Sequence, residues 1–317
     1  MSKRRKHKID EILNYLEKQE LQNNTVRNAV TENISFFRNS YSILSFYKWL
    51  CTKAPEIKPE NLLELMDIDS ASPYDTELIS SLAATERKLF PGLINPIVKR
   101  IFRLIACENA GLIASIGSGA MEVERQVISK LLRSGNDKPV VFIGIDISAS
   151  SHNFAKQNLA SIKSELTIIE IKELDDTSLQ SVLNERKSLY TVILCNNDVF
   201  SLDKYFSESR FDLAYNCFFK HHVTAVDSEK IDNILKKHSK KVIEYDGVKN
   251  NFNSFIQSLF VWGKPVLLSG TVFSNLRYKK KSEIKSTNTD FSIKTYWMKG
   301  THMKEFNAPL IPETTKI

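Results

Sequence analysis

Apolar side chains recur at helical spacing through the first third of the chain. In residues 9–21 they return every three or four positions, which predicts one face of an amphipathic helix. Residues 34–50 form a second apolar segment that is rich in aromatic side chains, and the helical pattern resumes over residues 75–90 and 93–110. No strand-like alternation is clear before Gly111, so we predict a helical region up to that point.

The pattern changes at Gly111, where short β-rich runs begin to alternate with helical segments. Near-continuous apolar strands separated by helices are typical of a mostly parallel sheet covered on both faces. The last two runs are separated by a polar stretch instead of a helix, which predicts an antiparallel hairpin at one edge. Residues 165–171 are an additional strand candidate without an assigned place in the sheet. The seven predicted strands are residues 112–116, 139–146, 190–196, 211–219, 240–246, 265–273 and 291–298.

Together these elements predict the fold class. We expect an α/β fold with a Rossmann-like, mostly parallel seven-stranded sheet and helices on both faces, preceded by an N-terminal helical cap region. The expected domains are residues 1–105, the helical cap region, and residues 106–317, the Rossmann-like domain. A chain of 317 residues is long enough for one large α/β domain with such an extension.

The composition is that of an ordinary globular protein, with 42% hydrophobic and 26% charged residues. No run of about eighteen apolar residues is present, so we expect no membrane insertion. The basic N-terminus, MSKRRKHK, is not followed by the apolar segment of a secretory signal. The four cysteines have no CxxC spacing, which favours buried, reduced thiols over a zinc site. These features predict a cytoplasmic protein without a bound metal.

The formal net charge of the chain is +7, and much of it comes from three basic runs. Lysine and arginine runs can contact phosphate groups, but they more often form solvated termini, helix ends and loop tips. The charge by itself therefore gives only weak support to a nucleic acid partner. The runs lie within residues 3–8, 236–241 and 279–281.

A loop with two glycines, Gly117-Ser118-Gly119, stands between a predicted strand and a predicted amphipathic helix. In open α/β sheets, ligands bind beyond the carboxyl ends of the strands. A GxG pair is also compatible with an ordinary tight turn, where glycine relieves the backbone. Met121 replaces the third glycine of the dinucleotide fingerprint. A side chain there would narrow the pocket, which argues against a pyrophosphate-bridged dinucleotide.

Polar side chains follow the later strands where a nucleoside would lie. Asp146 ends a strand 27 positions after Gly119 and can accept hydrogen bonds from both ribose hydroxyls, or alternatively cap the next helix. Asp198 follows a later strand and can accept the amino group of adenine, or alternatively form a turn. Asn216 lies near the carboxyl end of its strand, where cofactor and substrate should meet.

These motifs, in this order, resemble those of the class I S-adenosylmethionine-dependent methyltransferases over roughly residues 111–299. The family's first motif matches residues 113–121, its ribose-binding acid matches Asp146, and its adenine-side acid matches Asp198. Its fourth motif, a strand led by Phe-Asp, matches residues 211–216. The FFKHH that follows is similar to the aromatic-histidine stretch of many small-molecule methyltransferases. The order and spacing of these motifs are more telling than any one of them.

The resemblance implies which residues bind S-adenosylmethionine. Ser115 stands where the family usually has an acid that helps to position the methionine end of the cofactor, and Glu122 is the candidate to replace that acid. The glycine loop would line the methionine and the ribose, and the end of the next strand would hold the ribose and the adenine. The candidates are Ser115, Gly117, Ser118, Gly119, Glu122, Asp146, Ile147, Asp198 and Val199, with Asn216 beside the methionine portion.

Two histidines, His221 and His222, fall where a methyl acceptor would bind. Methyl transfer from a sulfonium is an in-line displacement in which proximity and orientation supply much of the acceleration. A base is needed only if the acceptor must lose a proton, and a histidine can serve. Alternatively, these histidines only pack or form hydrogen bonds. The aromatic residues of segment 34–50 can likewise line an acceptor cavity or pack between helices.

The sequence therefore predicts a SAM-dependent methyltransferase, of EC 2.1.1 type, with a small-molecule acceptor bound between the helical cap and the Rossmann-like domain. An RNA or protein methyltransferase is the first alternative. The basic balance favours it, but no RNA-binding module and no NPPY-like motif is recognisable. A non-catalytic adenosyl-binding protein is the second, since Ser115 and Met121 depart from the family pattern. The sequence leaves the acceptor, the methylated atom and the oligomeric state open.

Overall fold

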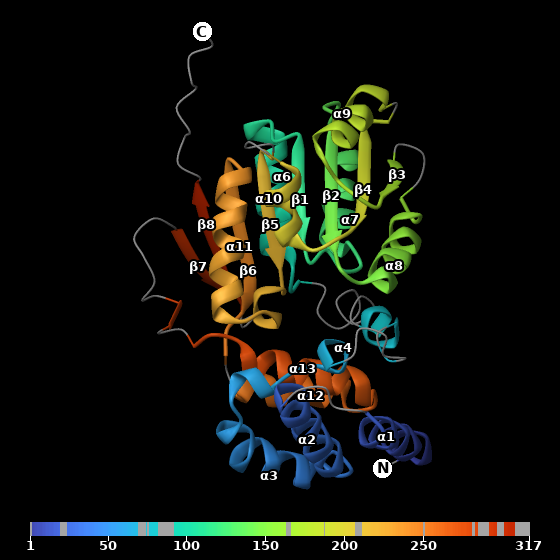
Figure 1. Ribbon diagram of the computed structural model, residues 1–317, viewed down its shortest axis with the longest axis vertical. Helices are drawn as coiled ribbons and strands as arrows, with labels where there is room; N and C mark the ends of the chain where they lie inside the picture. The colour runs from blue at the N-terminus through green and yellow to red at the C-terminus, as the bar shows by residue number, and fades with distance from the viewer. Residues whose placement is uncertain are drawn as a thin grey trace. The chain divides into compact units, whose positions relative to one another are not determined.

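The computed structural model of the chain contains two compact units (Figure 1). One comprises Met1–Thr85 with Gly247–Ser286, and the other Glu86–Asp246 with Thr287–Ile317. This division differs from the expected boundary near residue 105, because a second segment of the chain joins the N-terminal helices. The structure describes residues 2–19, 24–68, 74, 76–81, 92–162, 166–186, 188–206, 211–249, 251–280, 283–284, 292–296 and 301–307.

Helices and short 3₁₀ helices are the regular elements of the first unit in its described residues, apart from Gly247, which ends β6. Ser2 and Ser42 cap α1 and α3 by accepting hydrogen bonds from backbone N–H groups in the first turn. Phe36 lies at the centre of the core, where its ring contacts those of Phe46, Trp49 and Phe273. The elements are α1 (Lys3–Glu17), α2 (Asn24–Asn39), α3 (Ile43–Thr52), η1 (Ala54–Glu56), η2 (Pro59–Asn61), α4 (Leu65–Ile68), α12 (Asn251–Val261) and α13 (Pro265–Arg277).

The core of this unit decides between two interpretations of the aromatic segment 34–50. Phe36, Phe37, Phe46 and Trp49 are at most 3% exposed and pack against other helices of the same unit. They therefore form the hydrophobic core, as aromatic stripes usually do. Tyr47 is 48% exposed, and its ring packs against Phe255.

One predicted strand is wrong: residues 265–273 form most of helix α13. Ten of the thirteen residues of α13 are buried, so the helix is apolar on nearly all sides and shows no helical period. A short continuous apolar run cannot distinguish a buried helix from a buried strand. Pro265 in the first turn is compatible with a helix start, because its missing N–H would have no partner there.

The second unit is built on an eight-stranded sheet in the order β3-β4-β2-β1-β5-β6-β8-β7. Strands β1 to β6 pair in parallel, and β7 and β8 form an antiparallel pair. The predicted class, a mostly parallel Rossmann-like sheet, is therefore confirmed. The strands are β1 (Leu112–Ile116), β2 (Val140–Asp146), β3 (Leu166–Ile171), β4 (Tyr190–Asn196), β5 (Leu213–Cys217), β6 (Lys241–Gly247), β7 (Ser292–Tyr296) and β8 (Thr301–Asn307).

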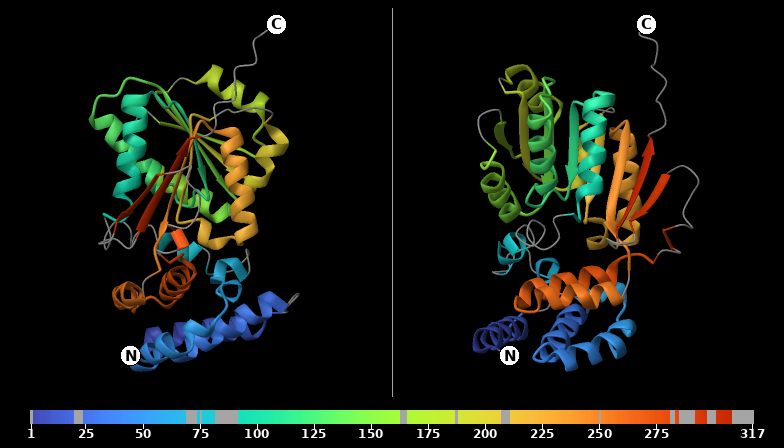
Figure 2. Two further views of the ribbon diagram at one scale, coloured as in Figure 1. Left: turned by 90° about the vertical axis from the view of Figure 1, so that its left-hand side faces the viewer. Right: turned by 180° about the vertical axis from the view of Figure 1, so that it is seen from behind.

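Helices cover both faces of this sheet (Figures 1 and 2). One face packs against α6, α7 and α8, and the other against α9, α10 and α11. Side chains alternate between the two faces along each strand, so Ile113 belongs to one core and Ala114 to the other. The helices are α6 (Asn95–Glu108), α7 (Glu122–Arg133), α8 (Ala149–Leu159), α9 (Asp176–Glu185), α10 (Leu202–Tyr205) and α11 (Ala225–His238), with the short η3 (Val199–Ser201) and η4 (Lys220–His222).

The two strands without a clear sequence prediction lie toward the edges of the sheet. The unplaced candidate at residues 165–171 is β3, which pairs with β4 at the edge of the described sheet and is half-buried. Strand β8 was not predicted, because its sequence, THMKEFN, mixes charged and apolar residues. It lies between β6 and β7. None of the described helices combines the length and the hydropathy needed to cross a bilayer.

Candidate functional site

The first glycine of the loop adopts a backbone conformation that its neighbours enforce. Gly117 follows β1 directly and has a φ of +61°, in the left-handed region that favours glycine. Its N–H donates to the carbonyl of Ile145 in β2 at 2.9 Å. A Cβ at Gly117 would lie 2.3 Å from the ring of Phe219, which follows β5. Glycine is therefore required here for both the turn and the close approach of an aromatic ring.

The second glycine leaves open space in front of the loop. Gly119 has a φ of +51°, and a Cβ placed there would meet no described atom within 4 Å. Its N–H donates to Oδ2 of Asp146 at 2.8 Å, and the N–H of Ser148 donates to Oδ1 at 2.9 Å. Asp146 thus ties the loop to the end of β2. Ser148, not Asp146, caps α8, by accepting from the N–H of Ser151.

Met121 points into the core instead of narrowing a pocket. It is fully buried, with a φ of +52°. A Cβ at Gly144 of β2 would lie 3.1 Å from its Sδ and Cε atoms, so the glycine makes room for the thioether. The same Cβ would lie 2.9 Å from Oγ of Ser118. That Oγ is buried and has no hydrogen-bond partner within the described part of the chain.

The side chain of Ser115 is engaged beneath α7. Its hydroxyl hydrogen-bonds to Glu124 and Tyr215, and the Tyr215 hydroxyl donates to Oε1 of Glu124. All three side chains are at most 3% exposed. Burial raises the pKa values of Glu124 and Tyr215, because the surroundings disfavour their charged forms. The Ser115 hydroxyl is therefore engaged inside the protein, and its expected contact with the cofactor stays a prediction.

Glu122 anchors the loop instead of presenting a free carboxylate. Its carboxylate pairs with Arg125 at 2.5 Å and accepts from Gln126 and Asn158 at 3.1 Å each. Burial opposes its ionisation, but these hydrogen bonds and the Arg125 charge outweigh burial and lower its pKa to about 2. Asn158 also donates to the carbonyl of Ala120 at 2.7 Å, so α8, the loop and α7 are joined at this point.

Side chains after β2 and β4 form the part of the site expected to meet adenine. Ile147 directly follows Asp146 and is 74% exposed, which is unusual for an isoleucine. Asp198 is exposed and caps η3 by accepting from the N–H of Phe200 at 3.1 Å, as the turn alternative predicted. Val199 is buried in the core. An apolar surface for a base is therefore supplied at Ile147 and at Phe200, which is 38% exposed.

Asn216 is the most unusual polar residue near the loop. It lies near the carboxyl end of β5, in register with Ile116, the residue before Gly117. Its exposed fraction is 0%, yet neither Oδ1 nor Nδ2 has a hydrogen-bond partner among the residues that the structure describes. Leaving a buried polar atom unsatisfied costs about 1–3 kcal/mol. Such a group indicates a place that a bound molecule completes.

The two candidate catalytic histidines lie together on η4. Nδ1 of His221 is 2.9 Å from Oδ1 of Asp246 at the end of β6, and both side chains are at least 90% buried. The ring of His222 lies beside that of His221, with 4.1 Å between the centroids. The sequence analysis did not identify Asp246. The feature of the sequence that could have revealed it is the pair of acids, Glu244 and Asp246, in a largely apolar predicted strand.

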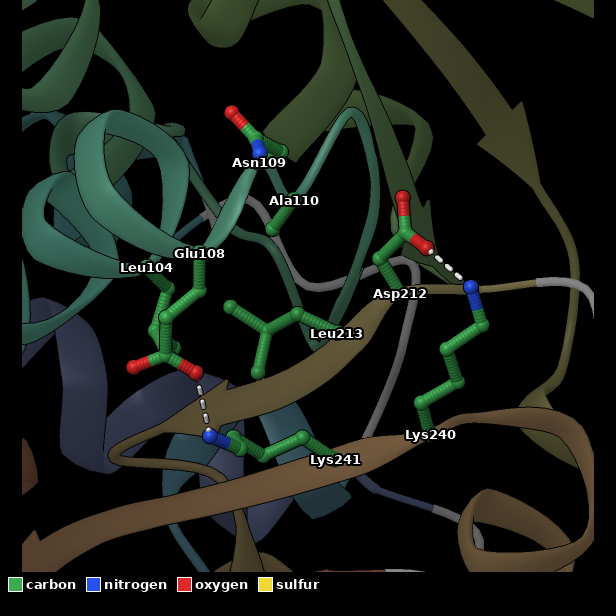
Figure 3. Close-up of a pocket in the computed structure, with 8 residues that line it drawn as sticks. All are labelled: Leu104, Glu108, Asn109, Ala110, Asp212, Leu213, Lys240 and Lys241. Atoms are coloured by element: carbon green, nitrogen blue, oxygen red, sulfur yellow. Dashed lines mark hydrogen bonds and ion pairs between the residues drawn. The ribbon is translucent and has the colours of Figure 1, made fainter. Parts of the chain in front are cut away.

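A cavity of about 220 Å³ lies where β1, β5 and β6 begin, at the amino ends of the parallel strands and away from the glycine loop (Figure 3). Its charged residues pair with one another: Lys240 with Asp212, and Lys241 with Glu108, at 2.8 Å each. None of the candidate cofactor-binding or catalytic residues predicted from the sequence lines it. The candidate site therefore lies at the carboxyl ends of the strands, where the loop follows β1, Asp146 ends β2, and Asn216 lies near the end of β5. His221 follows β5 on η4.

Comparison with solved structures finds methyltransferases. The CurJ carbon methyltransferase matches at 10% identity with a TM-score of 0.49, over 96% of this chain and 70% of that one. An O-methyltransferase family protein from Burkholderia thailandensis matches at 10% identity and 0.48, over 89% and 71% of the chains. The plantazolicin methyltransferase BpumL matches at 13% identity and 0.48, over 82% and 99%. No family model matches the sequence, and no curated protein is significantly similar to it. At these values the function must be argued from the residues of the site.

Proposed function

We propose that the protein is an S-adenosylmethionine-dependent methyltransferase with a small-molecule acceptor. The observation that carries this proposal is the buried, unpartnered carboxamide of Asn216 beside a glycine loop that Asp146 holds in place. A tight turn with no ligand role would not require an unsatisfied amide at the adjacent strand end.

The residues present fit an adenosyl ligand. The open space at Gly119 lets a ligand approach the backbone, and exposed Ile147 offers an apolar face to the adenine ring. An ionised carboxylate has about four acceptor sites, so Asp146 can accept from ribose hydroxyls in addition to the loop. Asn216 and the buried Oγ of Ser118 supply polar contacts for the methionine portion. When bound, S-adenosylmethionine supplies an electrophilic methyl group on a sulfonium.

His221 is the best candidate for a general base in the transfer. Asp246 holds Nδ1, which favours the tautomer that carries its proton there and makes Nε2 the nitrogen that can take a proton from the acceptor. A carboxylate in this position also stabilises the imidazolium that forms. Orientation of the acceptor supplies the rest of the acceleration.

Charge pairing favours a small-molecule acceptor over RNA. In the basic run at residues 236–241, Lys237, Lys240 and Lys241 each pair with an acidic side chain at 2.8 Å. In the N-terminal run, Lys8 pairs with Glu77, and Arg5 stacks on Trp262. A surface that binds nucleic acid needs cations available to phosphates, and these five cations each have an acidic or aromatic partner within the protein.

Calorimetric titration of the purified chain with S-adenosylmethionine and S-adenosylhomocysteine tests the proposal. We expect micromolar binding, weakened at least about tenfold in Asp146→Ala through loss of the bonds to ribose and of the loop tie. Asp203→Asn is the matched control, because its carboxylate pairs with Lys237 and His238 away from the loop. A well-folded wild type that binds neither compound would refute the proposal. Salt-dependent RNA binding would instead favour the RNA methyltransferase.

A further inference from the structure

Two acid–base pairs join η4 to β6. Lys220 and His221 are consecutive in η4, while Glu244 and Asp246 are two positions apart on β6 and face the same side of the sheet. Nζ of Lys220 lies 3.5 Å from Oε2 of Glu244, and Nδ1 of His221 lies 2.9 Å from Oδ1 of Asp246. The Lys220 pair therefore lies directly beside the pair that contains the proposed base.

Lys220 also contacts residues other than Glu244, its partner on β6. Its side chain is 3% exposed, and its ammonium contacts Oδ1 of Asp232 and donates to the carbonyl of Ser228 at 3.1 Å, both on α11. An ammonium has three donors, and the three contacts come from two elements. Lys220 thus ties η4 to both α11 and β6.

Glu244 remains ionised as the partner of Lys220. Burial opposes its ionisation, but His302 of β8 lies 3.5 Å away, and this contact with the charges of Lys220 and Lys304 holds the pKa of Glu244 well below its usual value. The ammonium is therefore opposed by a charged carboxylate inside the protein. A buried ion pair is weak evidence for stability, because desolvation offsets much of the attraction. A role in geometry accounts better for placing this lysine next to His221.

We propose that Lys220 is a positioning residue for His221: it holds η4 against β6 and α11 so that Nδ1 of the imidazole meets Asp246. This inference rests on the proposed function for its catalytic consequence, but the arrangement of His221 can be measured without turnover. Arginine would not replace the lysine, because its planar fork cannot meet the same three partners as a compact ammonium.

The test compares Lys220→Met with wild type in the full-length chain. Nitrogen–proton NMR of the histidine side chains, with the His221 signals assigned through His221→Gln, reports which ring nitrogen carries the proton. We expect wild type to show the Nδ1–H form, and Lys220→Met to lose it. With an acceptor identified, we expect kcat to fall at least about tenfold, while KM and the affinity for S-adenosylhomocysteine change little. Lys237→Met, which removes an exposed lysine paired with Asp203, should leave every readout unchanged.

Two results would overturn the inference. The first is a wild-type His221 signal and wild-type turnover in folded Lys220→Met, which would leave the lysine only a structural role. If Lys220→Met does not fold, Asp232→Asn is tested instead, because it removes the charge of one half-buried partner of the ammonium. The second overturning result is an unchanged His221 signal in Asp232→Asn. Absence of turnover or cofactor binding in wild type would contradict the proposed function and leave the NMR result to decide the inference.

Discussion

At the scale of single residues, glycine is favoured at the two loop positions, Gly117 and Gly119, for different physical reasons. Gly117 is confined by the Phe219 ring as well as by its positive φ, whereas Gly119 has a positive φ and open space. The first glycine therefore serves the packing of the protein, and the second leaves room for a ligand. Conformation alone, which both glycines share, does not separate these roles.

Substituting the glycines by alanine should separate packing from ligand binding. A positive φ costs alanine about 1–2 kcal/mol at either position. Gly117→Ala also forces Phe219 to move, so we expect it to lose more of the free energy of unfolding than Gly119→Ala. Gly119→Ala should weaken binding of S-adenosylhomocysteine more than its stability loss explains. Urea unfolding and calorimetry measure the two effects.

The control for the clash is the double variant Gly117→Ala/Phe219→Ala. Because the smaller side chain removes the contact, the two losses in stability should be less than additive. Equal stability losses for the two glycine variants, or fully additive losses in the double variant, would contradict the close approach of the Phe219 ring.

At the scale of elements, the start of α7 depends on charge. The helix has no side-chain N-cap, and Met121 before it has a left-handed conformation. Glu122, whose pKa is lowered, lies in its first turn, where negative charge complements the helix dipole. Glu122 also joins α7 to α8 through Asn158. The loop is therefore held by a buried ionised carboxylate, and its stability should depend on pH.

Glu122→Gln tests that dependence. The pKa of Glu122 is lowered from 4.5 to about 2 in the folded chain. Its ionisation therefore stabilises the fold above about pH 4.5, and the contribution is lost as the pH falls toward 2. At pH 7 we expect the variant to lose on the order of 2–3 kcal/mol of unfolding free energy. The gap should narrow steadily between pH 4.5 and pH 3 in urea titrations.

A surface carboxylate provides the comparison for Glu122. Glu170 is 61% exposed and pairs with Lys156 at 2.9 Å. Exposed pairs contribute about 0–1 kcal/mol, so Glu170→Gln should change stability little at any pH. A pH-independent effect of Glu122→Gln would show that its carboxylate is not ionised in the folded protein.

At the scale of the whole molecule, the helical unit is assembled from two segments that are distant in the sequence. Helices α1 to α4 share one core with α12 and α13, and α13 is the most deeply buried of them. The Rossmann-like unit is likewise completed by the hairpin after residue 287. Each unit is therefore built from two segments that are separated in the sequence.

Deletions should reveal this arrangement. Removing residues 2–81 leaves α13 without the partners that bury ten of its residues, so we expect aggregation or loss of amide protection in α13. Removing the whole helical unit, with a short glycine-serine linker joining Asp246 to Thr287, should leave a soluble Rossmann-like unit. Solubility and hydrogen exchange measure both outcomes. A soluble first variant with a protected α13 would contradict the shared core.

The amino-acid sequence by itself determined the elements with strong local patterns. The parallel strands β1, β2, β4, β5 and β6 are largely apolar runs, and the helices between them have clear periods, so the local pattern indicated the Rossmann-like class. The glycine loop and the acid at the end of β2 were likewise readable from their spacing. The structure adds that Asp146 holds the glycine loop, because its Oδ2 accepts a hydrogen bond from the N–H of Gly119 at 2.8 Å.

Only the tertiary structure decided what depends on distant partners. Residues 265–273 form part of a helix that packs against α1, α2, α4 and α12, and a segment buried on nearly all sides has no polar face to show its period. Asp246 and Glu124 gained their partners through packing between strands and helices that are far apart in the sequence. For the same reason, Ser115 and Glu122 form hydrogen bonds with other side chains inside the protein. Local pattern reports which face is buried, and the fold alone determines what each buried polar group meets.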